Sequence, residues 1–277
     1  MINPPNLKTF TKLKFIASTA ILCMIVNTLF AQPNPKENSK NVTLHFDNVV
    51  NGKPLVLGNG QFKNEANESF SITTFNYFIS NISLVKENGE VFVVPQDDSY
   101  FLHKAVDSTT ANMPFRLPDG KYQSISFLIG VDSVRNTMDI SRRTGALDIA
   151  GGMLEGMYWT WNSGYIFLKM EGLSEQAPID RTGQRKFRYH IGGFGGYDKP
   201  SLNNIRQVTL SLKEKGGLEI KGGSPAKINV QTDAAKVLNG KTNVSIAKNT
   251  QVMFGDFSSL IADNYAKMFS LLSVVDN

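Results

Sequence analysis

Cysteine is nearly absent from this sequence of 277 residues, and its absence narrows the chemistry open to the chain. The one cysteine, Cys23, lies in an N-terminal apolar run that we expect to be removed. The remaining chain then has no disulfide, no thiolate metal site and no cysteine nucleophile. A chain without such cross-links depends on its hydrophobic core, and this length is enough to build a large one.

Excess charge of either sign is also scarce. The formal net charge of the whole sequence is +5, but three lysines and no acidic residues lie in the first 31 residues. Without that segment, 26 basic side chains balance 24 acidic ones. So weak a charge gives no electrostatic support for binding nucleic acid or an anionic membrane, and we expect no nucleic-acid partner.

The first 31 residues have the order of a secretory signal. Three lysines precede an apolar run over Phe15–Phe30, and Ala31 ends the segment. The run of about sixteen residues is shorter than the ~20 that a spanning helix needs, and charge, apolar run and small residue follow in the order of a signal peptide. An uncleaved anchor is the alternative. Leu22 stands where a lipoprotein signal requires a small residue, so we do not expect a lipid on Cys23.

The sequence therefore predicts a signal peptide over residues 1–31, a polar tether over 32–41 and one domain over 42–277. Export to the periplasm or the exterior is the expected localisation.

Alternation of apolar and polar residues dominates the predicted domain. In "VTLHF", Val42, Leu44 and Phe46 share one face, and Thr43 and His45 take the other, as in a half-buried strand. Similar short segments, punctuated by glycine, proline and asparagine, continue to residue 233. This pattern predicts an all-β fold, an antiparallel β-sandwich.

Three segments depart from the alternation. A turn over residues 87–89 predicts a hairpin. A short helix is expected over Asp233–Leu238, and a longer one over Phe257–Leu272, where apolar residues recur at helical spacing, is expected to cap the sandwich.

The long connection over Asp132–Gly152 is the only segment that suggests an enzyme, because long ordered loops are often functional. Its glycines, Gly145, Gly151 and Gly152, predict tight packing beneath it. Asp132, Asp148 and the nearby Glu155 could form a glycosidase pair or a calcium site. Binding of loop backbone amides is the favoured interpretation. No G-x-S-x-G motif of a serine hydrolase is present, and we expect a non-catalytic protein, with an enzyme as the third-ranked alternative.

Three histidines, His45, His103 and His190, all lie in predicted strands. No two have a local metal-binding spacing, so only the fold can bring them together. Taken singly, each reads as a surface or hydrogen-bonded residue. Their number matches the three ligands of a zinc enzyme, but nothing in the sequence supports that geometry.

The only two tryptophans, Trp159 and Trp161, are two residues apart and would share one face of a strand. A core aromatic ladder is the simplest reading. Alternatively, the pair could stack on a sugar ring. It could also border a soft metal, since Met153, Met157 and Met170 supply thioethers and the histidines supply imidazoles, donors that suit Cu(I).

Several blocks occur in a fixed order along the chain: "GKYQSISFLIGVDSVRN", "GALD", "GM", "YWTWNSGYIFLKMEG" and "FRYHIGG", with "FNYFISNISLV" before them and "NYAKMF" after them. Together they resemble the MbnP-like family, exported copper-binding β-sandwich proteins named for a methanobactin-associated member. The resemblance runs from about Val42 to Phe269. One departure is Ile149, which follows "GALD" where the family pattern has proline.

The resemblance implies a periplasmic protein that holds copper, as Cu(I) or Cu(II), through histidines and a tryptophan oxidised to kynurenine by a partner di-haem peroxidase-like enzyme. The oxidised residue would be Trp159 or Trp161. His190 is the first ligand implied and His45 the second, while His103 lies outside the matching blocks. Since the chain has no C-x-x-C-H, it binds no covalent haem and is not itself the oxidising partner.

Two hypotheses follow. In the first, His45 and His190 meet to hold copper for storage, delivery or uptake, with an outer-membrane uptake protein as a further partner. In the second, a metal-free sandwich binds a carbohydrate or a surface protein through its aromatic pair. The second requires both tryptophans to face solvent, whereas the first requires at least one to lie beside a histidine or a methionine.

Overall fold

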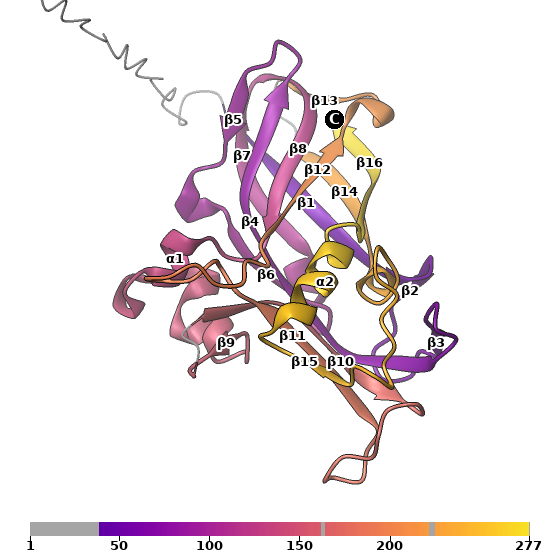
Figure 1. Ribbon diagram of the computed structural model, residues 1–277. Helices are drawn as coiled ribbons and strands as arrows, with labels where there is room; N and C mark the ends of the chain where they lie inside the picture. Colours follow the sequence, from indigo (N-terminus) through magenta and orange to yellow (C-terminus); the bar gives the residue numbers. More distant parts are fainter. Residues whose placement is uncertain (1–38, 162–163, 222–224, 277) are drawn as a thin grey trace, which may run out of the picture. The chain divides into compact units, whose positions relative to one another are not determined.

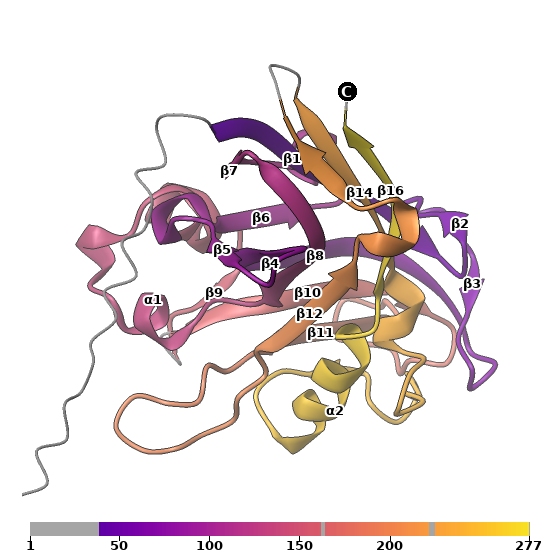
Figure 2. The ribbon, with the colours of Figure 1, turned by 90° about the horizontal axis from the view of Figure 1, so that it is seen from above.

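The computed structural model describes residues 39–161, 164–221 and 225–276. These residues belong to one compact unit, built from two β-sheets packed face to face (Figures 1 and 2). The predicted signal peptide and most of the predicted tether lie outside the described residues. Of the helices in the described ranges, none is long and apolar enough to cross a membrane.

The smaller sheet, sheet A, is built around β1, which lies between β14 on one side and β7 and β2 on the other. β1 and β14 run parallel, with Val42 opposite Ala226. The sequence predicted an antiparallel sandwich, and this pair departs from that prediction. A parallel pair needs a long crossover, and here nearly all of the second sheet lies between the two strands in sequence. The strands of sheet A are β1 (Ser39–Val50), β2 (Lys53–Pro54), β7 (Asn112–Pro118), β14 (Ala226–Asp233) and β16 (Phe269–Asp276).

The larger sheet, sheet B, has the central order β12-β8-β4-β10-β11-β15, and its last pair is also parallel. The segment beginning at Ser69 forms one strand of 18 residues, β4, and the predicted hairpin joins it to β5. The strands of sheet B are β3 (Phe62–Lys63), β4 (Ser69–Lys86), β5 (Val91–Val93), β6 (Tyr100–Lys104), β8 (Gly120–Ile129), β9 (Tyr158–Trp159), β10 (Gly164–Ser174), β11 (Lys186–Gly192), β12 (Arg206–Ser211), β13 (Leu218–Ile220) and β15 (Gln251–Val252).

The main core lies between the sheets, and four aromatic rings join them. Phe46 and Phe269 come from sheet A, and Tyr77 and Phe127 come from sheet B. Ring centroids in this group lie 5.2–6.0 Å apart, with the rings steeply inclined to one another. Edge-to-face contacts of this kind add to the free energy gained by burying the rings.

The C-terminal helix is shorter than predicted. α2 ends at Tyr265, and the chain enters strand β16 at Phe269. A short apolar run fits both helical and strand periods, and the free edge of β14 decides between them by pairing with β16. The predicted helix over 233–238 is a 3-10 turn. The helices and turns are α1 (Ser133–Thr137), α2 (Asp256–Tyr265), η1 (Gln96–Asp98), η2 (Ser108–Ala111), η3 (Ile140–Arg142), η4 (Gly145–Leu147), the π turn η5 (Ile149–Met153), η6 (Lys213–Lys215) and η7 (Ala234–Val237).

A second hydrophobic cluster lies on the outer face of sheet B, beneath the long connection that follows β8. Phe78 and Phe167 belong to this cluster, whereas their strand neighbours Tyr77 and Leu168 face the main core. Gly152 lies against the ring of Phe78, where a Cβ would be only 2.6 Å from the nearest carbon. The prediction of tight packing under this connection is confirmed at that glycine.

The acidic residues of the connection stabilise its own turns. The Asp132 carboxylate accepts from the Arg135 amide at 3.1 Å, and that of Asp148 accepts from the Gly151 amide at 2.5 Å. The favoured interpretation is therefore confirmed for these two. Glu155 instead forms an ion pair with Lys104 at 3.0 Å.

Candidate metal centre

His45 lies on the outer face of sheet A, as the alternation of β1 predicted. Its neighbours Leu44 and Phe46 are buried in the main core, so its side chain points the other way. Nδ1 lies 2.8 Å from Asn112 Oδ1, and Nε2 lies 3.2 Å from Asp47 Oδ1. Both ring nitrogens thus have protein partners.

His103 lies between the sheets and is only 1% exposed. Its Nε2 lies 2.6 Å from the Asn48 amide nitrogen, and its Nδ1 lies 3.4 Å from Thr110 Oγ1. Burial, with a smaller contribution from the nearby His45, lowers the pKa of His103 to about 4. The imidazole is therefore neutral, with Nε2 accepting from Asn48.

His190 lies on the outer face of sheet B, because Tyr189 and Ile191 take the core side of β11. Its Nε2 lies 2.6 Å from Glu171 Oε1 on the neighbouring strand β10. That hydrogen bond lowers the pKa of Glu171. No hydrogen-bond partner for Nδ1 of His190 is found within the described ranges.

The structure does not bring His45 and His190 together. One points outward from sheet A and the other points outward from sheet B, so the whole sandwich separates them. Stacked sheets lie about 10 Å apart, a spacing too large for one ion held by bonds of about 2 Å. The predicted site that joins these two histidines is therefore wrong.

The two tryptophans touch, but they do not share a strand. Strand β9 ends at Trp159, and Trp161 lies in the turn that follows it, with the next two residues outside the described ranges. The ring centroids are 5.3 Å apart. Trp159 is 5% exposed and belongs to the second cluster, whereas Trp161 is 63% exposed.

Trp159 lies on the same side of β11 as His190. A Cβ added to Gly192 would meet the Trp159 ring at 2.7 Å, so the indole occupies the space above this glycine. Residues two apart on a strand point to one face, which places Trp159 on the His190 side of the sheet.

Methionines also lie in or on the cluster that contains this indole, although they are not the three that the sequence indicated. Met157 belongs to the second cluster and Met153 packs against it, as predicted. Met170, in contrast, faces the main core on the other side of the sheet. Met253, which the sequence analysis did not single out, also packs on the second cluster. The pairing of β15 with β11 would have been needed to find it.

Substituting Gly192 with alanine is expected to displace the Trp159 ring. The new methyl group would lie 2.4 Å from Tyr165 O and 2.7 Å from the indole. We expect a loss of roughly 1–3 kcal/mol in the free energy of unfolding, as for other overpacked sites, and a shifted tryptophan emission spectrum. Gly183→Ala is the matched control for a change without a steric clash, because no atom lies within 4 Å of its Cβ position, although its positive φ adds a backbone cost. An unchanged emission spectrum for Gly192→Ala would contradict the packing described.

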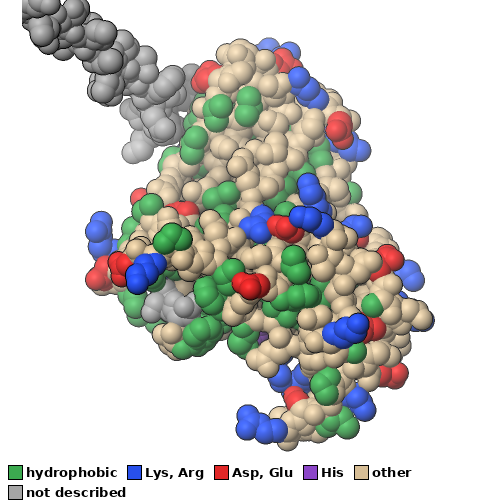
Figure 3. Space-filling model, in the orientation of Figure 1, with side chains coloured by type: hydrophobic (Ala, Val, Ile, Leu, Met, Phe, Trp, Pro, Cys, Tyr) green, Lys and Arg blue, Asp and Glu red, His purple; other side chains and the backbone are tan. Residues whose placement is uncertain are grey.

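The rest of this side of the protein is partly apolar at its surface. In Figure 3, hydrophobic side chains gather around the region where Figure 1 places α1, β9 and β11. Leu154, Trp161 and Phe254 are among the exposed apolar residues, and the Phe254 ring lies 6.4 Å from that of Trp159. Only one of the two tryptophans faces solvent, so the pair does not form the open double platform that the metal-free hypothesis requires.

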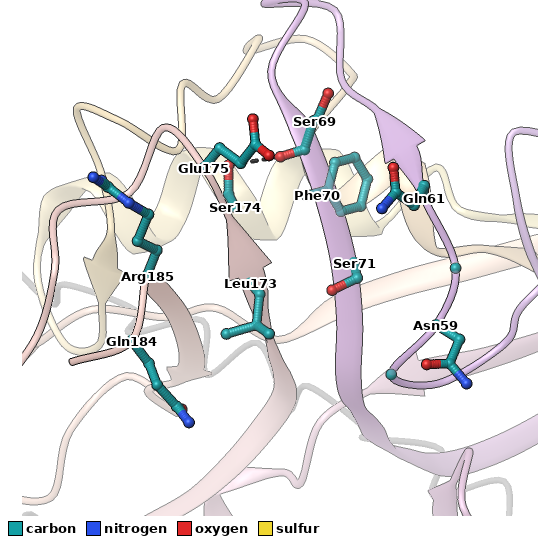
Figure 4. Close-up of a pocket in the computed structure, with 12 residues that line it drawn as sticks. Asn59, Gln61, Ser69, Phe70, Ser71, Leu173, Ser174, Glu175, Gln184 and Arg185 are labelled. Carbon is teal, nitrogen blue, oxygen red and sulfur yellow. Dashed lines mark hydrogen bonds between the residues drawn. The ribbon is translucent and has the colours of Figure 1, made fainter. Parts of the chain in front are cut away.

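A polar groove of about 630 Å³ crosses the other end of the same sheet face. Figure 4 shows Asn59, Ser71, Leu173 and Gln184 in a row across it. Its one aromatic lining residue, Phe70, is buried in the main core. The groove therefore offers no stacking surface for a sugar ring.

No group of three or more histidine, cysteine, aspartate or glutamate side chains suited to a metal ion occurs within the described ranges. On this face of sheet B, the potential donors are the His190 imidazole, the Glu171 carboxylate that is hydrogen-bonded to it, and the thioethers of the methionines in or packed on the second cluster. The imidazole and the thioethers are borderline and soft donors, which suit copper in its lower oxidation state better than a hard cation.

Comparison with known proteins agrees with this architecture. A family model named MbnP matches residues 39–254. Among curated proteins, none matches the sequence. Among solved structures, MbnP from Methylosinus trichosporium is similar with a TM-score of 0.58 and 15% sequence identity, over 87% of this chain and 100% of that chain. The structural similarity shows that the two proteins share a β-sandwich fold. Because the family model spans well over half of the sequence, the chain belongs to the MbnP family.

Proposed function

We propose that the protein is an exported, non-catalytic copper-binding protein and that His190 anchors the copper. The observation that carries the proposal is the placement of His190, Trp159 and methionine side chains on one face of sheet B. Membership of the MbnP family supports a copper-related role. Storage, delivery or uptake outside the cytoplasm are the roles that such a protein would serve.

The surroundings of His190 fit a copper ligand. Glu171 holds Nε2 and thereby fixes the ring, as carboxylates commonly do for metal-binding histidines. Nδ1 is then the nitrogen left to bind the ion. The connection over Asp132–Gly152 contributes Leu147 to the cluster that contains Trp159, and the Trp159 side chain is only 5% exposed. When bound, copper would add a soft Lewis acid to this face.

A partner enzyme of the di-haem peroxidase type would oxidise one tryptophan, and an outer-membrane protein would take the loaded protein as its partner. Trp161 is the ring that another protein can reach directly, since it is 63% exposed. Trp159 lies against it and over Gly192, two residues beyond the proposed copper ligand on the same strand.

Elemental analysis of the mature protein purified from the envelope of its own host tests the proposal. We expect stoichiometric copper in the native protein and its loss in His190→Ala. His45→Ala is the matched control, because it removes a partly exposed strand histidine from the opposite face. Mass spectrometry of the peptide that contains Trp159 and Trp161 would show a kynurenine if one is oxidised.

Three outcomes would decide against parts of the proposal. A protein that lacks copper and takes up none when Cu(I) is offered would refute the copper function. Loss of copper in His45→Ala but not in His190→Ala would move the site to sheet A. Two intact tryptophans would remove the oxidised residue and its enzyme from the proposal.

A further inference from the structure

We infer that Met253 binds the same ion as His190 through its thioether sulfur, and that the site therefore selects Cu(I) over Cu(II). This inference rests on the proposed copper function and adds to it a ligand and an oxidation state. It comes from the pairing of β15 with β11, which the sequence does not reveal.

The strand register sets Met253 beside His190. β11 and β15 run parallel, with Arg188 opposite Gln251 and Tyr189 opposite Val252. Continued by one residue, the register places Met253 opposite His190. Neighbouring strands lie about 4.8 Å apart, so the two side chains start from adjacent positions.

Both side chains point to the same face. Tyr189 and Val252, the preceding pair, are buried in the main core. Met253 instead packs against the cluster on the outer face, the cluster to which Trp159 belongs. Because successive residues of a strand alternate between faces, Met253 and His190 both lie outside sheet B.

Glu171 binds only Nε2 of His190, and it does so from the β10 side of β11. In sheet B, β11 lies between β10 and β15. The carboxylate that holds Nε2 of His190 comes from β10, whereas Met253 follows β15 on the other flank. The histidine is thus anchored from one neighbouring strand, and Met253 follows the other. The Met253 sulfur accepts a hydrogen bond from the side-chain amide of Gln251 at 3.7 Å.

The spacing and the chemistry agree. A metal ion bound to one nitrogen at about 2.0 Å and one sulfur at about 2.3 Å holds its two donors roughly 4.3 Å apart or less, close to the distance between neighbouring strands. A thioether is a soft donor that stabilises Cu(I), and it contributes little to the affinity for Cu(II) or Zn²⁺. The phenyl ring of Phe254, the residue after Met253, lies 6.4 Å from the indole of Trp159, measured between ring centroids.

The test compares Met253→Leu with the unchanged full-length protein in competition titrations of Cu(I) against a chromophoric chelator under anaerobic conditions. We expect the Cu(I) affinity to fall roughly tenfold or more, with the Cu(II) affinity unchanged. Ag(I), a soft ion that undergoes no redox change, should show the same loss. X-ray absorption of the Cu(I) form should show sulfur scattering that disappears in the variant.

Met170→Leu is the matched control. It removes a thioether from β10, but on the core side of the sheet, and Leu-for-Met exchanges usually cost less than about 1.5 kcal/mol of stability. Its Cu(I) affinity should remain that of the unchanged protein, and the thermal midpoints of both variants show that they are folded.

The outcomes separate this inference from the function on which it rests. If the unchanged protein binds no copper, the proposed function fails. If it binds Cu(I) through His190 and Met253→Leu binds it equally well, only the role of Met253 is refuted. A parallel loss of Cu(I) and Cu(II) affinity in Met253→Leu would also refute the inference, because a thioether ligand acts mainly on the softer ion.

Discussion

Phe46→Ala is expected to lower the free energy of unfolding by about 3–5 kcal/mol, the range for removing a buried aromatic ring. Phe46 is 2% exposed, and its ring contacts those of Tyr77, Phe127 and Phe269. Because these contacts link sheet A to sheet B, the cavity would open at the junction of the two sheets. Urea unfolding followed by circular dichroism measures the loss.

Phe92→Ala serves as the control for this substitution. Phe92 lies on the short strand β5 and is only partly buried against the core. Its removal should cost clearly less, since a partly buried ring gives up less buried apolar area and leaves no closed cavity. Equal losses for the two variants would mean that the ring cluster does not join the sheets in the way described.

Acid is expected to destabilise the protein by about 3 kcal/mol through His103 alone. Burial between the sheets lowers the pKa of this histidine from 6.5 to about 4. The unfolded chain therefore binds a proton more readily than the folded one between these two values. The stabilisation is complete above pH 6.5 and is lost as the pH falls through this window towards 4.

Urea titrations at several pH values between 7 and 4.5 would measure this slope, and His103→Gln should flatten it. Glutamine is uncharged throughout the range and can still meet the amide of Asn48. His45→Gln is the control and should retain the slope, because His45 is only a secondary cause of the lowered pKa. A steep slope that survives in His103→Gln would have to come from other groups.

Glu68 also changes the free energy of unfolding at the acidic end of this pH range, which overlaps the range in which His103 acts. Burial alone would raise the pKa of this carboxyl, but hydrogen bonds from Asn64 and Ser245 and from the amides of Ile246 and Ala247 outweigh burial and lower it. The stabilisation that the lowered pKa of Glu68 gives to the folded state is present above about pH 4.5 and is lost as the pH falls below it. The effect of His103 is therefore best measured above that value.

Much of the fold was accessible from the sequence because strand alternation is local. The faces of β1 and β11 follow directly from which residues are apolar, so His45 and His190 were placed correctly on outer faces. The C-terminal helix was overextended because "FSLLSVVD" is apolar at both periods, and only the edge of β14 decides that it pairs as a strand. The parallel pairs could not be predicted, since they join strands with no local relation in sequence.

The sequence likewise identified some residues of the candidate site, but not how the fold arranges them. Residue types identified His190 and the tryptophans, and proximity along the chain identified Met153 and Met157. Which sheet carries each histidine depends on topology, so the predicted meeting of His45 and His190 was wrong. Met253 lies more than sixty residues beyond His190 in sequence, and only the pairing of β15 with β11 brings the two together.

The parallel pairing of β1 with β14 has a consequence for how the chain reaches its native state. The two strands that form the middle of sheet A are separated by about 180 residues, with Val42 opposite Ala226. Closing so long a loop is entropically costly, and contacts of this kind slow folding. During synthesis, β1 has no β14 to pair with until nearly the whole polypeptide has been made. An incomplete chain therefore exposes the edge of its first strand, and sheet A is completed only when the last part of the chain arrives.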